Sequence, residues 1–178
     1  SCSAWLGSAL RGGYRDAVRE RWIRISIASQ MLEVLEGSQV VGAYPVSTSA
    51  QGGGEQMGSE QTPRGAHEVS ELIGAGAPIS AVFVGRRSTG EICTPELEAA
   101  NPDRDWILSR VIWLGGRENG RNRGGEVDTR SRYIYIHGTP DSQPLGEPRS
   151  HGCIRMRNPD VIALFEAVET GMLVQIDE

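Results

Sequence analysis

Two stretches decide the fold of this chain: Tyr-Ile-Tyr-Ile-His at residues 133–137 and Ser-His-Gly-Cys-Ile-Arg-Met at residues 150–156. In both, large aliphatic residues alternate with polar or reactive ones. Successive side chains of a β-strand point to opposite faces, so this alternation predicts two strands that are each buried on one face. One face then carries Cys153 together with His151 and Arg155, and His137 together with Tyr133 and Tyr135. The other face is expected to enter a core through Ile134, Ile136, Ile154 and Met156.

The reactive face combines a thiol with imidazoles. A cysteine thiol has an unperturbed pKa of about 8.5 and is a poor nucleophile until it ionises. An imidazole within hydrogen-bond distance can take the proton, as in the Cys–His pairs of covalent acyl transfer. His137 precedes Cys153 by 16 residues and His151 precedes it by two. We favour His137 as the base because it comes from a separate segment, and a buried structural cysteine or a core histidine are the ordinary alternatives.

The composition is that of an ordinary globular protein. The 178 residues suit one domain, and a hydrophobic content of 38% can supply its core. The net charge of −5 argues against a nucleic-acid binder, which would carry a basic stripe. No apolar run approaches the roughly 18 residues that span a membrane, and no signal-peptide pattern is visible. We therefore expect a soluble chain, from which a leader could have been removed before residue 1.

The remaining periodicities predict a β-rich domain with few helices. Residues 1–21 are expected to be a helical or linker segment, and residues 22–178 the domain. One helix is expected near the C-terminus, where Asn158 is a candidate cap, Pro159 suits the first turn and Gly171 suits the exit. Strands are expected near residues 23–27, 31–35, 40–46, 66–73, 79–84, 107–114, 132–137, 151–156 and 172–176.

Two further features leave alternatives open. Cys2 could be the remnant of a lipid anchor, although its position at the chain start has simpler explanations. All 18 basic residues are arginine, and three of them lie in the glycine-rich segment 115–125. These three, Arg117, Arg121 and Arg123, could meet the carboxylates of an anionic ligand. A solvated loop without a ligand is equally compatible with the segment.

The motif residues resemble the L,D-transpeptidase catalytic domain (YkuD type), a family of bacterial cell-wall enzymes with a cysteine nucleophile. The resemblance covers about residues 22–177. It implies a mainly β, single-domain fold of the β-sandwich-like kind, with an accessory C-terminal helix. It rests on His137-Gly138-Thr139, residues 150–158, the hairpin near 23–46, residues 62–65, Asp160, Leu164, Gly171 and Val174.

The resemblance also implies roles for the motif residues. Cys153 would be the nucleophile and His137 the general base. Ser150 would fix the geometry of the turn, and His151 would lie beside the thiolate. The backbone N–H groups of Gly152 and Cys153 would be candidates for an oxyanion hole, because glycine permits close backbone approach.

Residues around the motif would complete the substrate site. A backbone carbonyl of Gly138 or Thr139 would orient the base, and Tyr135 would form part of the cleft wall. Arg155 is expected to bind a substrate carboxylate. The alternative for Arg155 is a structural ion pair with Asp160 or Glu166.

The implied reaction is acyl transfer from a peptidoglycan tetrapeptide donor to an amine acceptor through a thioester on Cys153. The bond expected to break joins diaminopimelate to D-Ala. With water in place of the amine, the same thioester gives an L,D-carboxypeptidase. Such an enzyme needs no cofactor or metal, and it would act in the periplasm or cell envelope.

Two other classes of function remain. His67, His137, His151 and Cys153 could in principle form a His3Cys zinc site, although their spacing lacks a typical zinc-binding motif. A non-catalytic peptidoglycan-binding module would also fit the family resemblance, but it would be expected to lack the nucleophile–base pair that is present here.

Overall fold

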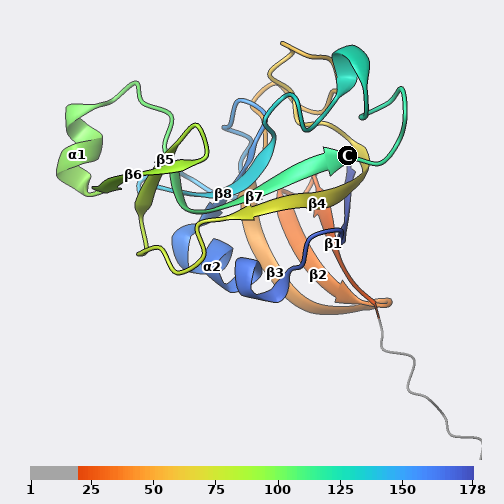
Figure 1. The fold of residues 1–178 in the computed structure, drawn as a ribbon, viewed down its shortest axis with the longest axis horizontal. Helices are drawn as coiled ribbons and strands as arrows, with labels where there is room; N and C mark the ends of the chain where they lie inside the picture. The colour runs from red at the N-terminus through yellow and green to blue at the C-terminus, as the bar shows by residue number, and fades with distance from the viewer. Residues whose placement is uncertain (1–19) are drawn as a thin grey trace, which may run out of the picture.

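The computed structural model describes residues 20–178, which form a mainly β domain (Figure 1). The segment predicted to be helical or a linker, residues 1–21, lies outside the described residues except for its end, where the first strand begins at Arg21. The elements in chain order are β1 Arg21–Ser26, β2 Met31–Glu36, β3 Gln39–Ser47, β4 Gly65–Ile73, β5 Ala81–Val84, β6 Arg87–Ile92, α1 Pro95–Ala100, β7 Ile107–Gly116, η1 Gly125–Val127, β8 Tyr135–Thr139, β9 Ile154–Arg157, α2 Asn158–Ala167 and β10 Leu173–Asp177.

The strands form one strongly curled sheet. Its strand order is β4-β10-β1-β2-β3-β9-β8-β7-β5-β6, and β4 also pairs with β7. That additional pairing closes the first eight strands of the order into a ring, and the β5–β6 hairpin extends from it. The prediction of a mainly β, sandwich-like single domain is confirmed. Within residues 20–178, no helix is long and apolar enough to cross a membrane.

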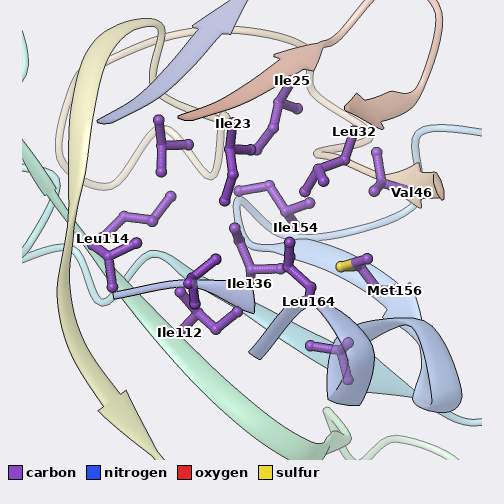
Figure 2. Close-up of a cluster of buried hydrophobic side chains, with 14 of the residues drawn as sticks. Ile23, Ile25, Leu32, Val46, Ile112, Leu114, Ile136, Ile154, Met156 and Leu164 are labelled. Carbon is purple, nitrogen blue, oxygen red and sulfur yellow. The ribbon is translucent and has the colours of Figure 1, made fainter. Parts of the chain in front are cut away.

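The core fills the interior of this ring (Figure 2). As predicted, the four aliphatic residues that alternate with the reactive ones are all buried in this core. They are Ile134, which precedes β8, Ile136 on β8, and Ile154 and Met156 on β9. The helix α2 packs against β7, β8 and β9 and adds its own apolar face. The side chains labelled in the figure are Ile23, Ile25, Leu32, Val46, Ile112, Leu114, Ile136, Ile154, Met156 and Leu164.

The outer face of β7 and β8 carries a second, smaller apolar cluster. It consists of Ala81, Phe83, Val111 and Tyr135, with Cys153 packed against it. The two clusters use alternate residues of the same strands, since Ile112 and Ile136 face the interior of the ring. The β5–β6 hairpin therefore covers the outside of the ring next to the cysteine.

The predicted strands at 132–137 and 151–156 are shorter in the structure. β8 begins only at Tyr135, because Tyr133 has a left-handed backbone with φ 56°. β9 begins at Ile154, after Gly152 at φ 131°. His151 therefore lies in a bend, and the prediction that it shares a strand face with Cys153 and Arg155 is wrong.

The C-terminal helix was predicted in the right place but with the wrong ends. Its N-cap is Arg157, and Asn158 is already the first helical residue. The side chain of Asn158 is not used as a cap because it hydrogen-bonds Thr139 and Ser109. The helix ends at Ala167, and Gly171, at φ 89°, belongs to the turn that enters β10.

The hairpin strand β6 and the short helix α1 were missed by the sequence analysis. The residues of β6, Arg-Ser-Thr-Gly-Glu-Ile, are mostly exposed and show no apolar alternation. α1 has only six residues and no buried side chain, although Thr94 caps it by accepting a hydrogen bond from the Leu97 N–H. Leu97 of α1 and Cys93, which follows β6, pack against a small local core of Val82, Trp106 and Leu108.

His67 provides a test of the core. It is fully buried in β4, and its ring nitrogens hydrogen-bond the Gly65 carbonyl and the Thr129 hydroxyl. Burial lowers the pKa of His67 from 6.5 to about 4. Between pH 6.5 and about pH 4, His67 is therefore protonated in the unfolded chain and neutral in the folded chain. The free energy of unfolding falls as the pH falls through this range.

We expect the free energy of unfolding of the wild type to drop by about 2 kcal/mol more between pH 7 and pH 5 than that of His67→Gln. Urea unfolding of both proteins at the two pH values measures the difference. The comparison concerns the change with pH, so any constant destabilisation by the substitution cancels. Equal changes in the two proteins would show that His67 is not buried in its neutral form.

Candidate active site

The candidate site is built on the parallel pairing of β8 with β9. In that register Ile136 lies opposite Ile154, and His137 lies opposite Arg155. Cys153 immediately precedes β9. Residues directly opposite each other point to the same face, so the cysteine, the histidine and the arginine all belong to the outer face, as the sequence predicts.

The Cys153 thiol is held by backbone groups of the segment that leads into β8. Its Sγ accepts a hydrogen bond from the Tyr135 N–H at 3.3 Å, and the thiol donates to the Tyr133 carbonyl at 3.3 Å. The residue is partly exposed at the surface. Burial raises the pKa of Cys153 to about 12, whereas the Tyr135 N–H and the charges of Arg155 and Arg132 act to lower it.

His137 is buried and is oriented by a carbonyl group. Its Nδ1 lies 2.7 Å from the carbonyl oxygen of Gly138, so Nδ1 carries the hydrogen and Nε2 keeps its lone pair. Burial lowers the pKa of His137. The resting pair is therefore a neutral thiol and a neutral imidazole. In this structure the thiol hydrogen-bonds Tyr133 and Tyr135 rather than the imidazole, and contacts of this kind often form only when substrate binds.

The turn before Cys153 is fixed by Ser150. Its hydroxyl donates to the Cys153 carbonyl at 2.5 Å and accepts from the Gly152 N–H at 3.2 Å. The Gly152 carbonyl accepts from the Thr62 hydroxyl at 2.9 Å. A β-carbon at position 152 would lie 3.3 Å from Ile134 and would need the same left-handed backbone, so glycine is required here.

A cavity lies next to this turn, on the side of His151. It has a volume of about 810 Å³, and His151 and Arg155 contribute to its wall. Arg155 is 9% exposed, and its guanidinium lies 3.6 Å from the Asp105 carboxylate. The acidic partner of Arg155 is therefore Asp105, and neither of the partners considered from the sequence, Asp160 and Glu166, has this role.

The loop that follows β8 is fixed from the side of the helix. The amide of Asn158 donates to the Thr139 carbonyl at 2.9 Å and accepts from the Ser109 hydroxyl at 2.7 Å. A β-carbon at Gly138 would lie 2.3 Å from the Asn158 side chain and 2.6 Å from the Leu108 carbonyl. Only glycine fits there, and its carbonyl is the one that orients His137.

Arg132 connects the thiol to the polar loop at residues 48–61. It is partly buried, and its guanidinium donates to the carbonyls of Gly54, Glu55 and Gln61. The loop in turn packs against Gly152, since the Gln61 carbonyl lies 3.4 Å from the position of a β-carbon there. Arg132 directly precedes Tyr133, so it also restrains the carbonyl that binds the thiol.

The structure brings most of the predicted site residues into one region. His137, Gly138 and Arg155 lie on the paired strands β8 and β9, Cys153 immediately precedes β9, and Thr139 borders the cavity. Tyr135 is 5% exposed and is therefore more a support of the site than a freely accessible wall. The residues that sequence reasoning missed are Asp105, Ser109, Arg132 and the supporting role of Asn158, because these side chains come from segments without a recognisable motif.

The zinc alternative has no support in the geometry. Among residues 20–178, no group of three or more His, Cys, Asp and Glu side chains is placed to hold a metal ion. The ring nitrogens of His67 are both engaged by protein oxygens.

The arginines of the 115–125 segment are mostly engaged within the protein. Arg117 lies 3.3 Å from Glu68 and donates to the Gly171 carbonyl, and Arg121 lies 3.2 Å from Glu118. These two guanidinium groups are therefore not free to receive a ligand without giving up existing contacts.

Comparison with protein families identifies the class of this chain. Residues 20–176 match the YkuD model, described as the L,D-transpeptidase catalytic domain. The match covers nearly the whole chain, so the chain belongs to the L,D-transpeptidase catalytic domain family. The family prediction made from the sequence is confirmed.

Two relatives that carry the L,D-transpeptidase name match parts of the chain. YbiS from Escherichia coli (strain K12) is 50% identical over 48 residues, which are 26% of this chain and 16% of YbiS. YqjB from Bacillus subtilis (strain 168) is 34% identical over 82 residues, which are 46% of this chain and 40% of YqjB. The match therefore spans less than half the length of either relative.

Solved structures share the fold. L,D-transpeptidase 3 from Mycobacterium tuberculosis, in complex with a faropenem-derived adduct, aligns with a TM-score of 0.54 and 19% identity over 89% of this chain and 60% of that chain. Bd1075 from Bdellovibrio bacteriovorus aligns with a TM-score of 0.53 and 18% identity over 92% of this chain and 49% of that chain. At these identities the likeness concerns the fold alone.

The link between Asn158 and Ser109 gives a stability prediction. Both side chains are buried, and removing either one leaves buried polar groups without partners. We expect Asn158→Ala to lower the free energy of unfolding by about 1–3 kcal/mol. The double variant with Ser109→Ala should be less destabilised than the sum of the two single variants, by about 1 kcal/mol. Urea unfolding of the four proteins measures this coupling, and additive effects would contradict the link.

Proposed function

We propose that this chain is a cysteine-dependent L,D-transpeptidase that acts on peptidoglycan stem peptides through a thioester at Cys153. The observation that carries the proposal is the position of the thiol. It lies on the same outer face as His137, whose Nε2 is free to accept a proton, and Cys153 stands between His151 and Arg155 in the chain, two residues that line a cavity.

The first half of the reaction forms the acyl-enzyme. As the sulfur attacks the carbonyl carbon of the scissile amide, Nε2 of His137 takes the thiol proton. The developing oxyanion needs a donor. The Gly152 N–H is already engaged by Ser150, so the Cys153 N–H is the better of the two candidates. The carbon–nitrogen bond then breaks, the imidazolium protonates the leaving amine, and the thioester remains.

The second half transfers the acyl group. An acceptor amine attacks the thioester and gives a proton to His137, the new amide forms, and the carbon–sulfur bond breaks. The imidazolium then returns the proton to the sulfur. If water attacks instead, a carboxylic acid results and the protein acts as an L,D-carboxypeptidase. The two activities share every residue named here and differ only in the acceptor.

A neutral resting pair suits this sequence of proton transfers. The thiol and the imidazole are both kept uncharged by burial, so no charge has to be desolvated before substrate enters. The imidazole is then an effective base at neutral pH, because it is not already protonated. Arg155, beside Asp105, would bind the carboxylate of the terminal D-residue on the leaving side.

The cellular setting follows from the substrate. A protein that acts on peptidoglycan peptides must reach the cell wall, so we place its activity in the periplasm or cell envelope. The tetrapeptide donor and the amine acceptor are its proposed partners. A lipid anchor at Cys2 falls outside the described residues and is not needed for this proposal.

Incubation with a disaccharide-tetrapeptide tests the function. We expect mass spectrometry of the protein to detect a thioester adduct equal to the peptide minus its terminal D-residue, and the product fraction to contain a dimer or a trimmed tripeptide. Cys153→Ala should form neither adduct nor product while it keeps its thermal stability, because the thiol contributes little to the ring core.

A second acylating reagent makes this test independent of the peptide. Faropenem, which yields the adduct of the mycobacterial relative, should add mass to the wild type and not to Cys153→Ala. Turnover that survives in Cys153→Ala would remove the nucleophile from the proposal. Products of trimming without any dimer would favour the carboxypeptidase.

The assignment of the base can be tested by thiol alkylation. His137→Ala should slow the reaction of Cys153 with iodoacetamide at neutral pH, because the base that takes the thiol proton is lost, and should lower acylation by the tetrapeptide about a hundredfold or more. His151→Ala should slow turnover with a smaller effect on the iodoacetamide rate, because His151 is exposed at the cavity wall. The reverse order of effects would transfer the base role to His151.

A further inference from the structure

A second arginine lies beside the thiol, on a different element from Arg155. Arg86 is in the turn of the β5–β6 hairpin, which lies next to β7 and β8 (Figure 1). Its guanidinium carbon is 4.7 Å from the centre of the Trp113 ring and 4.8 Å from the centre of the Tyr133 ring. One guanidinium nitrogen donates to the Tyr135 hydroxyl at 3.1 Å. Three aromatic residues thus hold this cation in place.

The backbone at Arg86 indicates that its side chain has a specific use. The two residues of the hairpin turn, Gly85 and Arg86, have φ values of 55° and 65°. Such turns favour glycine or asparagine at these positions, because other side chains strain a left-handed backbone. Arginine is an unusual choice in this turn. Tyr133, which contacts Arg86, has the same kind of backbone at φ 56°, and strained residues of this kind cluster at functional sites.

Arg86 has no ion-pair partner within 4 Å in the described part of the chain, and Glu71, whose charge acts on Arg86 from farther away, is paired with Arg130. Arg130, which also stacks on Trp113, lies 3.8 Å from Glu71. A guanidinium has five N–H donors, and the Tyr135 hydroxyl uses one of them. Arg86 therefore keeps donors and a positive charge available at a partly exposed position.

The cluster is connected directly to the nucleophile. The backbone groups that bind the Cys153 thiol belong to Tyr133 and Tyr135, whose side chains hold Arg86. Trp113 and Cys153 pack on the same apolar cluster. His137 occupies the next position of that face along β8, away from Tyr133. The thiol thus has an arginine toward each end of the strands, Arg155 near the base and Arg86 on the other side.

The proton transfers of the proposed reaction indicate which part of the substrate lies on each side of the thiol. The leaving amine receives its proton from His137 and the acceptor amine gives its proton to His137, so both must occupy the side of that residue. With the leaving group on the side of His137, the acyl part of the donor would extend the other way, toward Arg86. Stem peptides are anionic, and a guanidinium held over aromatic rings is a good partner for a carboxylate, which it can bind through two parallel hydrogen bonds.

We propose that Arg86, held by Trp113, Tyr133 and Tyr135, is a specificity-determining residue that binds a carboxylate on the part of the donor that becomes attached to Cys153. This inference rests on the proposed function, because it assigns a substrate group to the same reaction. Arg86 selects donors that carry a free carboxylate on the acyl side, and it takes no part in the proton transfers.

The test compares two donors and two variants. One donor is the disaccharide-tetrapeptide, and the other is the same molecule with its internal carboxylates converted to amides and its terminal carboxylate kept. The variants are Arg86→Gln and, as the matched control, Arg87→Gln, which changes the exposed neighbour in the same hairpin. The measurements are the kcat/KM of acylation of Cys153 by each donor and the rate of alkylation by iodoacetamide.

We expect Arg86→Gln to lower kcat/KM for the anionic donor about tenfold or more, mainly through KM, and to leave the amidated donor unaffected. The wild type should show a similar preference for the anionic donor, and Arg87→Gln should behave as the wild type. The iodoacetamide rate should be the same in all three proteins, since the thiol keeps its backbone contacts.

Three results would overturn the inference while leaving the proposed function intact. These are an unchanged kcat/KM of Arg86→Gln for the anionic donor, an equal loss with both donors, or a changed iodoacetamide rate. The last two would mean that Arg86 acts on the architecture of the site. If neither donor acylated the wild type, the proposed function itself would fail, so the two failures are distinguishable.

Discussion

The parallel register between β8 and β9 is the constraint on which the candidate site depends. With Ile136 beside Ile154, the aliphatic residues of both strands enter the ring core, and His137 and Arg155 come together on the outside. A slip of one residue would exchange the two faces of the slipped strand and move its isoleucine into solvent. The large apolar core therefore fixes the positions of the polar groups that line the site, without any bond between those groups being needed to hold the register.

The same burial sets the electrostatics of the site. A thiol and an imidazole that lie partly or wholly inside the protein both favour their uncharged forms, and the directions of their pKa shifts agree with this. The protein compensates with dipoles and distant charges rather than with an ion pair. The Tyr135 N–H, Arg132 and Arg155 all favour the thiolate. In the proposed reaction these groups would already be in place when the proton leaves, so the charge formed on sulfur would need little reorganisation.

Much of this arrangement could be predicted from the sequence, because the motif residues are close along the chain and alternate with strong core formers. The chain order of the strands other than β6, the outer face with Cys153 and His137, and the helix against the sheet all follow from periodicity. The supporting residues could not be predicted in this way. Asp105, Arg132 and Arg86 come from irregular segments or turns, and nothing local distinguishes them from other polar residues.

The choice among the arginines is the clearest case of this limit. The sequence drew attention to the segment 115–125, where Arg117 and Arg121 are paired with acids. Arg86, which forms no ion pair among residues 20–178, lies in a hairpin whose second strand shows no apolar alternation.

Because β4 and β7 close the ring, sequence changes in the ring and sequence changes in the β5–β6 hairpin have different consequences for folding. β4 and β7 pair along most of their length, whereas the strand pairing of the β5–β6 hairpin with β7 is limited to Val82 with Leu108 and Phe83 with Ile107. The hairpin lies outside the closed ring, so its turn can be altered or lengthened with little effect on the folding of the eight strands that carry the thiol and the imidazole. If Arg86 recognises the donor as proposed, changes in the hairpin could alter which donor is recognised while Cys153 and His137 keep their positions at the ring.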